Sequence, residues 1–174
     1  MVKLLIADDN KQITSILKEY SEKDGYEAVV AYDGEQALQE FGKDKFDLIL
    51  LDVMMPLKDG FTLASDIRKK DAEVPIIFLT AKSMKQDTIH GFQSGADDYI
   101  TKPFSQRLLL ERIRVLLRRQ DLKKSDGSEN NHIVYGDIEL DEARHLCTWK
   151  KRPVNLTVTE FLLVKSLVTR PGHV

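Results

Sequence analysis

The sequence predicts an α/β protein whose main part is a five-stranded, doubly wound parallel sheet. A smaller unit of antiparallel strands with one helix is expected to follow it. Short apolar runs alternate with helical periodicities over residues 1–120, and a turn-rich pattern begins after residue 132. Continuous apolar runs are typical of parallel strands covered on both faces, and consecutive β–α units imply right-handed crossovers.

Five short apolar runs are predicted as buried strands. They are KLLIA (3–7), EAVVA (27–31), DLILL (47–51), PIIFLT (75–80) and DYIT (98–101). The segments around them favour helices near residues 11–23, 34–42, 60–70, 84–94 and 105–120. Gly25, Gly34, Gly42 and Gly95 fall at the expected connections, where a positive φ or a close backbone approach is useful.

A flexible linker is predicted at residues 121–132, DLKKSDGSENNH, because this segment is polar and rich in turn residues. It would separate a domain at 1–120 from a part at 133–174. Short alternating strands after the linker indicate an antiparallel meander. A Thr157-x-x-Glu160 capping box then predicts a helix running toward Pro171-Gly172. About 40 residues are too few to bury an independent core.

Composition excludes several classes of protein. The chain has 174 residues, 42% of them hydrophobic, and a net charge of -2, so no strong field toward nucleic acid or anionic membrane is expected. The apolar runs are too short for a membrane span or a signal peptide. Cys147 is the only cysteine and is expected to be a small buried strand residue. A reducing, cytoplasmic location is therefore expected.

Polar side chains follow four of the predicted strands, at the point where each strand ends. Asp8 and Asp9 follow the first strand, Asp52 the third, Thr80 ends the fourth and Lys102 follows the fifth. In doubly wound sheets the ligand site lies at the carboxyl ends of the strands. These side chains are therefore expected to converge at one edge of the sheet.

This combination of groups predicts a phosphorylation site. Neighbouring carboxylates repel each other unless a cation is bound, and an oxygen-rich site of this kind suits Mg²⁺. The metal neutralises phosphoryl oxygens while a carboxylate attacks phosphorus in line, so an aspartate becomes a covalent phosphate acceptor. Thr80 and Lys102 would contact the phosphoryl group, and a cis bond at Pro103 would aim the lysine inward.

Each of these residues also has a structural interpretation. Asp8, Asp9 and Asn10 are typical of a helix N-cap, Asp52 of a turn, and Lys102 of a solvated surface. Thr80 is β-branched, as strand residues often are. The coincidence of all of them at one sheet edge favours the functional interpretation.

The segments LLIADDN, DLILLDVMMPLKDGF, PIIFLTAK and GADDYITKPF resemble bacterial two-component response regulators. The resemblance implies a flavodoxin-like (CheY-like) receiver, phosphorylated by a sensor histidine kinase. It implies that Asp52 is the phosphoacceptor, that Asp9 binds Mg²⁺ directly and Asp8 through water, and that the Met54 carbonyl is a further ligand. Thr80 and Tyr99 match the switch pair of the family, and Lys102 its phosphate-binding lysine.

Activated relatives of this kind are similar in pairing through the fourth helix, fifth strand and fifth helix. The resemblance places Asp97, Asp98, Arg112 and Arg119 in ion pairs of such a homodimer, around an apolar centre of Phe92 and Leu110. Thr88 and Leu108 depart from the charged pair that is usual at their positions, which implies a modified interface. The alternative for Arg118 and Arg119 is a solvated helix face.

Residues 133–174 resemble the beginning of an OmpR/PhoB winged-helix domain. The phrases HLCTWK and LTVTEFLL look most like ChvI-type regulators. The second helix, the recognition helix and the wing are not among these residues, so a truncated DNA-binding domain is expected. After residue 120 there are eight Lys/Arg and eight Asp/Glu, and Lys150-Lys151-Arg152 is expected to be a solvated turn. Promoter DNA is therefore expected as a partner only of an intact winged helix.

Two alternatives stay open. One is a stand-alone or dominant-negative receiver that acts through protein contacts. The other is a phosphohydrolase of the haloacid dehalogenase type, in which Asp8 would be the nucleophile. Its first motif has acidic residues at the first and third positions, whereas here the third position is Asn10. The expected protein is not an enzyme beyond self-phosphorylation from phosphodonors and slow autodephosphorylation.

Overall fold

The structure, a computed structural model, describes residues 1–81, 96–124, 132–142 and 145–169, with side chains only to residue 120 in the second of these ranges. The helix expected at 84–94, with Thr88 and Phe92, lies outside the described residues, as do Gly95, most of the expected linker and Pro171-Gly172. The chain divides into two compact units, Met1–Ile113 and Arg114–Val174. Each unit is described by itself.

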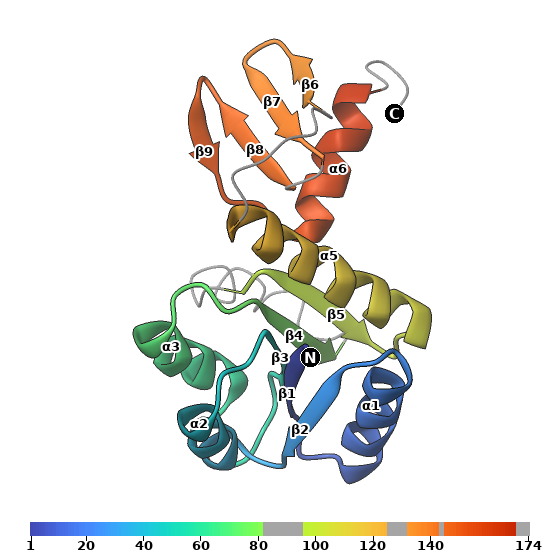
Figure 1. The fold of residues 1–174 in the computed structure, drawn as a ribbon, viewed down its shortest axis with the longest axis vertical. Coiled ribbons are helices and arrows are strands. Elements are labelled where there is room, and N and C mark those ends of the chain that lie inside the picture. Colours follow the sequence, from blue (N-terminus) through green and yellow to red (C-terminus); the bar gives the residue numbers. More distant parts are fainter. Residues whose placement is uncertain (82–95, 125–131, 143–144, 170–174) are drawn as a thin grey trace. The chain divides into compact units, whose positions relative to one another are not determined.

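The first unit is the predicted five-stranded parallel sheet with its helices (Figure 1). Its elements are β1 (Lys3–Ala7), α1 (Lys11–Lys23), β2 (Glu27–Ala31), α2 (Gly34–Lys43), β3 (Leu48–Asp52), α3 (Gly60–Lys70), β4 (Ile76–Ala81), β5 (Asp98–Lys102) and the first residues of α5 (Gln106–Lys124). The boundary between the two units falls within α5, after Ile113. The predicted strands are confirmed to within a residue at each end. α5 continues past the expected end at residue 120, because Leu and Lys propagate a helix well and no Gly or Pro interrupts it there.

The strand order β2-β1-β3-β4-β5 brings the carboxyl ends of β1 and β3 together. β1 and β3 are adjacent and parallel, with Ala7 opposite Leu51, so Asp8 and Asp52 leave the sheet at the same edge. The chain turns to β2 on one side of β1 and to β3 on the other. This is the switch point at which doubly wound sheets form their ligand crevice.

Both faces of the sheet are buried. Leu5 and Ala7 belong to an apolar cluster that includes Leu63 and Ile67 of α3. Leu4 and Ile6, which alternate with them along β1, are also fully buried. Because successive strand residues point to opposite faces, these two lie on the face covered by α1, whereas α2 and α3 cover the other (Figure 1).

Three helices of this unit begin at a side-chain cap beside the carboxyl edge of the sheet. Asn10 accepts a hydrogen bond from Gln12 N (2.9 Å) at the start of α1. Asp33 caps α2, and Asp59 caps α3 by accepting from Thr62 N (2.9 Å). Because Asn10 is the cap of α1, the preceding pair Asp8 and Asp9 is left for other roles.

The second unit contains the predicted antiparallel meander and helix. Its strands are β6 (His132–Tyr135), β7 (Ile138–Asp141), β8 (Leu146–Trp149) and β9 (Arg152–Val154), followed by α6 (Val158–Thr169). Phe161 of α6 packs in a small cluster with Leu140 and Cys147, which confirms the buried position expected for the cysteine. The predicted capping box also forms, with Thr157 N donating to Glu160 Oε2 (2.8 Å) and Glu160 N to Thr157 Oγ1 (3.2 Å).

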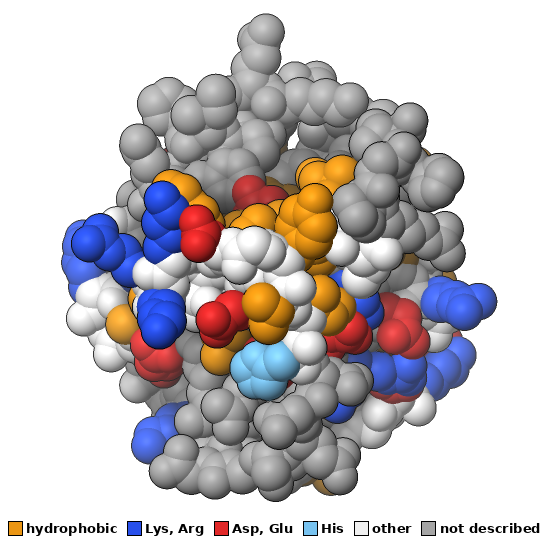
Figure 2. Space-filling model, turned by 90° about the horizontal axis from the view of Figure 1, so that it is seen from above, with side chains coloured by type: hydrophobic (Ala, Val, Ile, Leu, Met, Phe, Trp, Pro, Cys, Tyr) orange, Lys and Arg blue, Asp and Glu red, His pale blue; other side chains and the backbone are white. Residues whose placement is uncertain are grey.

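Charges of both signs are mixed among the described residues of the face shown in Figure 2. Viewed from above, Lys and Arg side chains lie among Asp and Glu and among exposed apolar groups (Figure 2). The turn at Lys150 and Lys151 has positive φ values of 50° and 63° and is exposed, as expected for a solvated turn. Within the described residues, every helix is too short or too polar to span a lipid bilayer.

Candidate functional site

Three carboxylates meet at the carboxyl edge of the parallel sheet. Oxygen atoms of Asp8, Asp9 and Asp52 all lie within 4.8 Å of one another. Asp8 is fully buried and Asp52 is 6% exposed, whereas Asp9 faces solvent. This is a cluster of hard oxygen donors that is open on one side, an arrangement that suits a divalent cation which keeps some of its water.

Lys102 is the cation that balances this cluster. Its Nζ lies 2.6 Å from Asp8 Oδ2 and 3.1 Å from Asp52 Oδ1, and the Lys102–Pro103 peptide bond is cis. Burial would lower the pKa of Lys102, but the carboxylates of Asp8 and Asp52 outweigh it and the pKa is raised. The ammonium group is therefore charged and shared between two carboxylates.

The Asp52 carboxyl has a raised pKa. Burial is the largest cause; the nearby Lys102 lowers the pKa in part, and the Asp8 charge raises it again. The backbone N–H of Met54 also donates a hydrogen bond to this carboxylate. Burial deprives the Asp52 carboxylate of hydration, so an added cation or an electrophile at this oxygen would relieve an unfavourable charge.

Thr80 and Tyr99 occupy different surroundings. Leu79 is the register partner of Asp52, so Thr80 lies one step further along β4 toward the site edge and is half-buried. Tyr99 lies opposite Phe78, and the two ring centroids are 5.6 Å apart. Thr80 is thus placed near the carboxylates, whereas the Tyr99 ring packs on the apolar cluster beneath α2 and α3.

The loop between β3 and α3, residues 53–59, contains features that sequence reasoning missed. Leu57 has a φ of 66°, and Lys58 N donates to Pro56 O across it (2.7 Å). A Cβ added to Gly60 would lie 3.0 Å from Val53 Cα and closer still to Asp52 O. Only glycine therefore fits at residue 60. The Asp59-Gly60 pair signals a turn, but no local signal reveals which backbone the glycine meets.

The connecting glycines differ in what they do. Gly25 has the expected positive φ, 87°, and Gly34 the expected close approach, to the backbone of Lys58. Gly42 is the penultimate residue of α2, where an added Cβ would meet no atom within 4 Å apart from the adjoining helix backbone, so neither the expected positive φ nor a close approach occurs there. The helix simply continues through it to Lys43.

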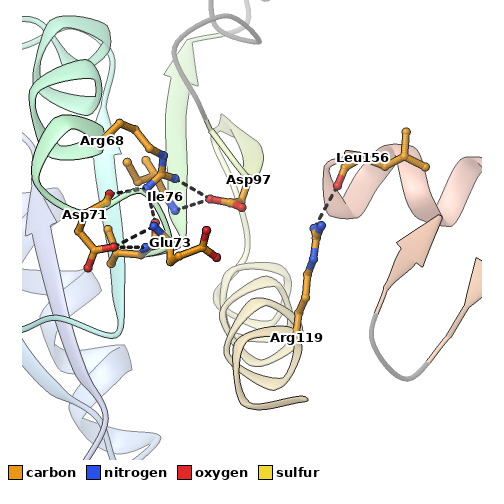
Figure 3. A network of polar contacts seen from close by, with 8 residues as sticks. Arg68, Asp71, Glu73, Ile76, Asp97, Arg119 and Leu156 are labelled. Atoms are coloured by element: carbon orange, nitrogen blue, oxygen red, sulfur yellow. Dashed lines mark hydrogen bonds and ion pairs between the residues drawn. The ribbon is translucent and has the colours of Figure 1, made fainter. Parts of the chain in front are cut away.

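Asp97 and Asp98, which the resemblance assigned to a dimer face, have partners within the chain. Asp97 Oδ2 accepts from Arg68 Nη2 (2.8 Å) and from Ile76 N (3.0 Å), joining α3, β4 and the start of β5 (Figure 3). Asp98 is fully buried and lies 3.4 Å from Arg112 Nη1. These pairs hold the described part of the face together within one molecule.

Leu110 and Arg119 of α5, which were assigned to the same face, are largely buried. Leu110 is 8% exposed, whereas Leu108 is 42% exposed. Arg119 is 9% exposed and donates from Nη1 to Leu156 O (3.1 Å) within the second unit (Figure 3). A solvated helix face therefore does not describe Arg119.

An open groove of about 470 Å³ lies beside the site. It is mostly apolar and is lined by Ile13, Ile16, Leu17 and Tyr20 of α1 together with Lys102, Pro103 and Phe104. Lys102 therefore lines this apolar groove and also pairs with the carboxylates of Asp8 and Asp52.

Comparison with known proteins agrees with this geometry. The profile of the family described as "Response regulator receiver domain" matches residues 4–114. The transcriptional regulatory protein RprY of Bacteroides fragilis is 41% identical over 99% of this chain and 72% of its own length. The transcriptional regulatory protein CpxR of Escherichia coli is 38% identical over the whole chain and 75% of its own length.

Solved structures show the same fold for the first unit. The Francisella response regulator 1452 receiver domain is 39% identical, with a TM-score of 0.64 over 68% of this chain and 98% of its own. The Vibrio cholerae chemotaxis protein CheY4 is 31% identical, with a TM-score of 0.64 over 67% of this chain and 98% of its own.

Proposed function

This chain belongs to the response regulators of two-component systems, with relatives of the OmpR/PhoB type, and we propose that Asp52 is its phosphoacceptor. The observation that supports this most directly is the carboxylate cluster. Oxygen atoms of Asp8, Asp9 and Asp52 lie within 4.8 Å of one another, and Lys102 bridges the two buried carboxylates. A sensor histidine kinase is the proposed donor. We propose that residues 1–120 form the receiver and 133–174 the start of the effector domain.

The residues fit Mg²⁺ through their donor chemistry. Asp8, Asp9, Asp52 and the Met54 carbonyl would hold the ion, all with hard oxygen atoms. When bound, it supplies charge neutralisation of the phosphoryl oxygens. An Asp52 oxygen forms the new bond to phosphorus in line, the bond from phosphorus to the kinase imidazole breaks, and its electron pair stays on that nitrogen, which takes up a proton. Lys102 is within reach to exchange its carboxylate partners for a phosphoryl oxygen.

Switching is proposed as a population shift. The receiver is proposed to exchange between two conformations that differ in how the fourth helix and β5 pack. A phosphoryl group on Asp52 shifts this equilibrium only if it forms better hydrogen bonds with Thr80 and Lys102 in one conformation than in the other. Tyr99, now packed on Phe78, would change position with Thr80. Ion pairs across a homodimer formed by the fourth helix, β5 and α5 would compete with the pairs that Asp97 makes with Arg68 and Asp98 with Arg112 within one molecule.

Control of transcription is proposed from the relatives, several of which are named transcriptional regulatory proteins. Residues 121–174 carry equal numbers of basic and acidic side chains, so they lack the positive charge that DNA affinity requires. We expect residues 1–174 alone not to bind operator DNA specifically. A salt-sensitive, sequence-specific mobility shift by the phosphorylated 174-residue chain would contradict this.

The second candidate is a receiver whose output is protein contact. The equal numbers of basic and acidic side chains in residues 121–174 favour it. Its test is co-assembly of phosphorylated residues 1–174 with an intact copy of a relative such as CpxR. The haloacid dehalogenase alternative is not retained. The family assignment stands against it, and Asp8, its nucleophile, is fully buried against Lys102.

Labelling with acetyl phosphate and Mg²⁺ tests the phosphoacceptor directly. Asp52→Asn should abolish the covalent phosphate, detected by intact-mass spectrometry. Asp59→Asn is the matched control, because it removes a carboxylate at the same edge while Asn still caps α3. Labelling that persists in Asp52→Asn, or that is lost equally in the control, would refute the assignment.

A further inference from the structure

The first turn of α2 packs directly on the loop that follows Asp52. A Cβ added to Gly34 would lie 2.8 Å from Lys58 Cβ, 3.0 Å from Lys58 C and closer still to Lys58 O. Real Cβ atoms essentially never approach a neighbour closer than 3.0 Å. Two of the three atoms that would be met are backbone, so a rotamer change cannot relieve the overlap. The loop itself would have to move.

Lys58 is also held by α3, through its side chain. Its Nζ lies 2.6 Å from Asp66 Oδ2 of α3, and both side chains are mostly covered, at 20% and 27% exposed. Hydrogen bonds from Lys58 and then Lys69 lower the pKa of Asp66 to about 2, so this carboxylate is ionised at neutral pH. Lys58 is therefore fixed between α2, through its backbone, and α3, through its side chain.

The backbone between Lys58 and the phosphorylation site is constrained. The Lys58 N to Pro56 O hydrogen bond closes a tight turn at Leu57, whose φ of 66° is unfavourable by about 1 kcal/mol for a residue with a side chain. Such a conformation persists only when its surroundings enforce it. The two ends of the loop are joined, because Gly60 N at the start of α3 donates to Val53 O (3.0 Å). A shift at Lys58 is therefore carried back toward Met54 and Asp52.

We propose that Gly34 is a positioning residue for the phosphorylation site, and that α2 acts through Lys58 to hold loop 53–59 in the geometry that binds metal and presents Asp52. The inference rests on the proposed function, because it concerns the Met54 carbonyl and the Asp52 carboxylate in their proposed roles. Gly34 touches neither of them. Its effect is transmitted along a loop clamped at both ends.

The test compares Gly34→Ala with Gly42→Ala in the 174-residue chain. Both glycines lie in α2, and a Cβ added to Gly42 would meet no atom within 4 Å apart from the adjoining helix backbone, so Gly42→Ala is a matched control. Alanine raises helix propensity at both sites. Gly42→Ala should bind Mg²⁺ and accept phosphate like the wild type. Gly34→Ala should bind Mg²⁺ about tenfold more weakly in calorimetry and be labelled by acetyl phosphate about 10- to 100-fold more slowly.

A second variant separates positioning from folding. Leu57→Gly removes the constraint at the positive φ, so in the Gly34→Ala background the turn can yield and labelling should recover at least in part. If Gly34→Ala matches Gly42→Ala in Mg²⁺ affinity and labelling and differs only in melting temperature, the positioning role is refuted and the proposed function stands. Absence of Mg²⁺-dependent labelling in the wild type and Gly42→Ala would instead overturn both.

Discussion

Replacing Lys102 by Met should strengthen Mg²⁺ binding while weakening phosphorylation. The substitution removes the ammonium group and keeps an unbranched apolar stem beside Pro103. Lys102 Nζ lies 2.6 Å from Asp8 Oδ2 and 3.1 Å from Asp52 Oδ1, so it already neutralises the carboxylates that the metal would use. A divalent ion must displace Lys102 or bind against its repulsion. Without the lysine, that opposition disappears.

The distances set the expected size of the effect. With the permittivity of water, Coulomb's law gives about 1.6 and 1.3 kcal/mol for the two pairs, and about four times as much at an effective dielectric of 20. Desolvation offsets part of this attraction. We expect a gain in Mg²⁺ affinity of at least about tenfold, or about 1.4 kcal/mol. Without metal, the variant should lose about 3 kcal/mol of stability, because two buried carboxylates lose their counter-charge.

Calorimetric Mg²⁺ titration and urea unfolding, each with and without Mg²⁺, measure these effects at neutral pH. Mg²⁺ should restore more stability to Lys102→Met than to the wild type, since a ligand stabilises the state to which it binds. Lys43→Met is the control, because Lys43 is 64% exposed in its pair with Glu40, and such pairs contribute little. Equal or weaker Mg²⁺ binding by folded Lys102→Met would refute the competition.

Three further predictions follow from the site and the predicted dimer face. Burial raises the pKa of Asp52, so its carboxylate should become protonated at a higher pH than an ordinary aspartate, whose pKa is about 3.9. As the pH is lowered, the rate of labelling by acetyl phosphate should therefore begin to fall above that value. Added Mg²⁺ should move this fall to lower pH. A rate that is constant down to about pH 4 would contradict it. The same raised pKa favours folding at pH values below the unfolded pKa, and this contribution is lost as the pH rises through the folded pKa. Asp52→Asn should therefore be more stable than the wild type in urea at neutral pH without Mg²⁺, with a difference that shrinks in acid; a difference that is constant with pH would count against this. Arg68→Ala removes the guanidinium that binds Asp97 and two backbone carbonyls, so it should lower the free energy of unfolding by about 1–3 kcal/mol. If Asp97 forms an ion pair between molecules, the same variant should strengthen the dimer of the phosphorylated chain, as measured by sedimentation. An unchanged or weaker dimer would show that Asp97 serves the fold alone.

The strands and the acidic cluster could be predicted from local features of the sequence. Continuous apolar runs specify buried parallel strands locally, and parallel strands end at the same edge, so placing Asp8, Asp9 and Asp52 together required no knowledge of packing. The capping box at Thr157 and Glu160 is also local, because its donors and acceptors lie within one helical turn. Both inferences depend only on residues close in sequence or on the rule for one sheet.

Which elements touch and which charges pair depends on how the whole fold packs. The approach of Gly34 to Lys58 depends on how α2 packs beside the loop after β3, a distance that hydrophobic periodicity does not encode. The sequence does not show which basic residue pairs with Asp97, and it is the packing of α3 against β4 and β5 that brings Arg68 to it. Periodicity specifies which side of an element is buried. Partners far apart along the chain are selected only when the packed elements bring particular atoms within a few ångströms.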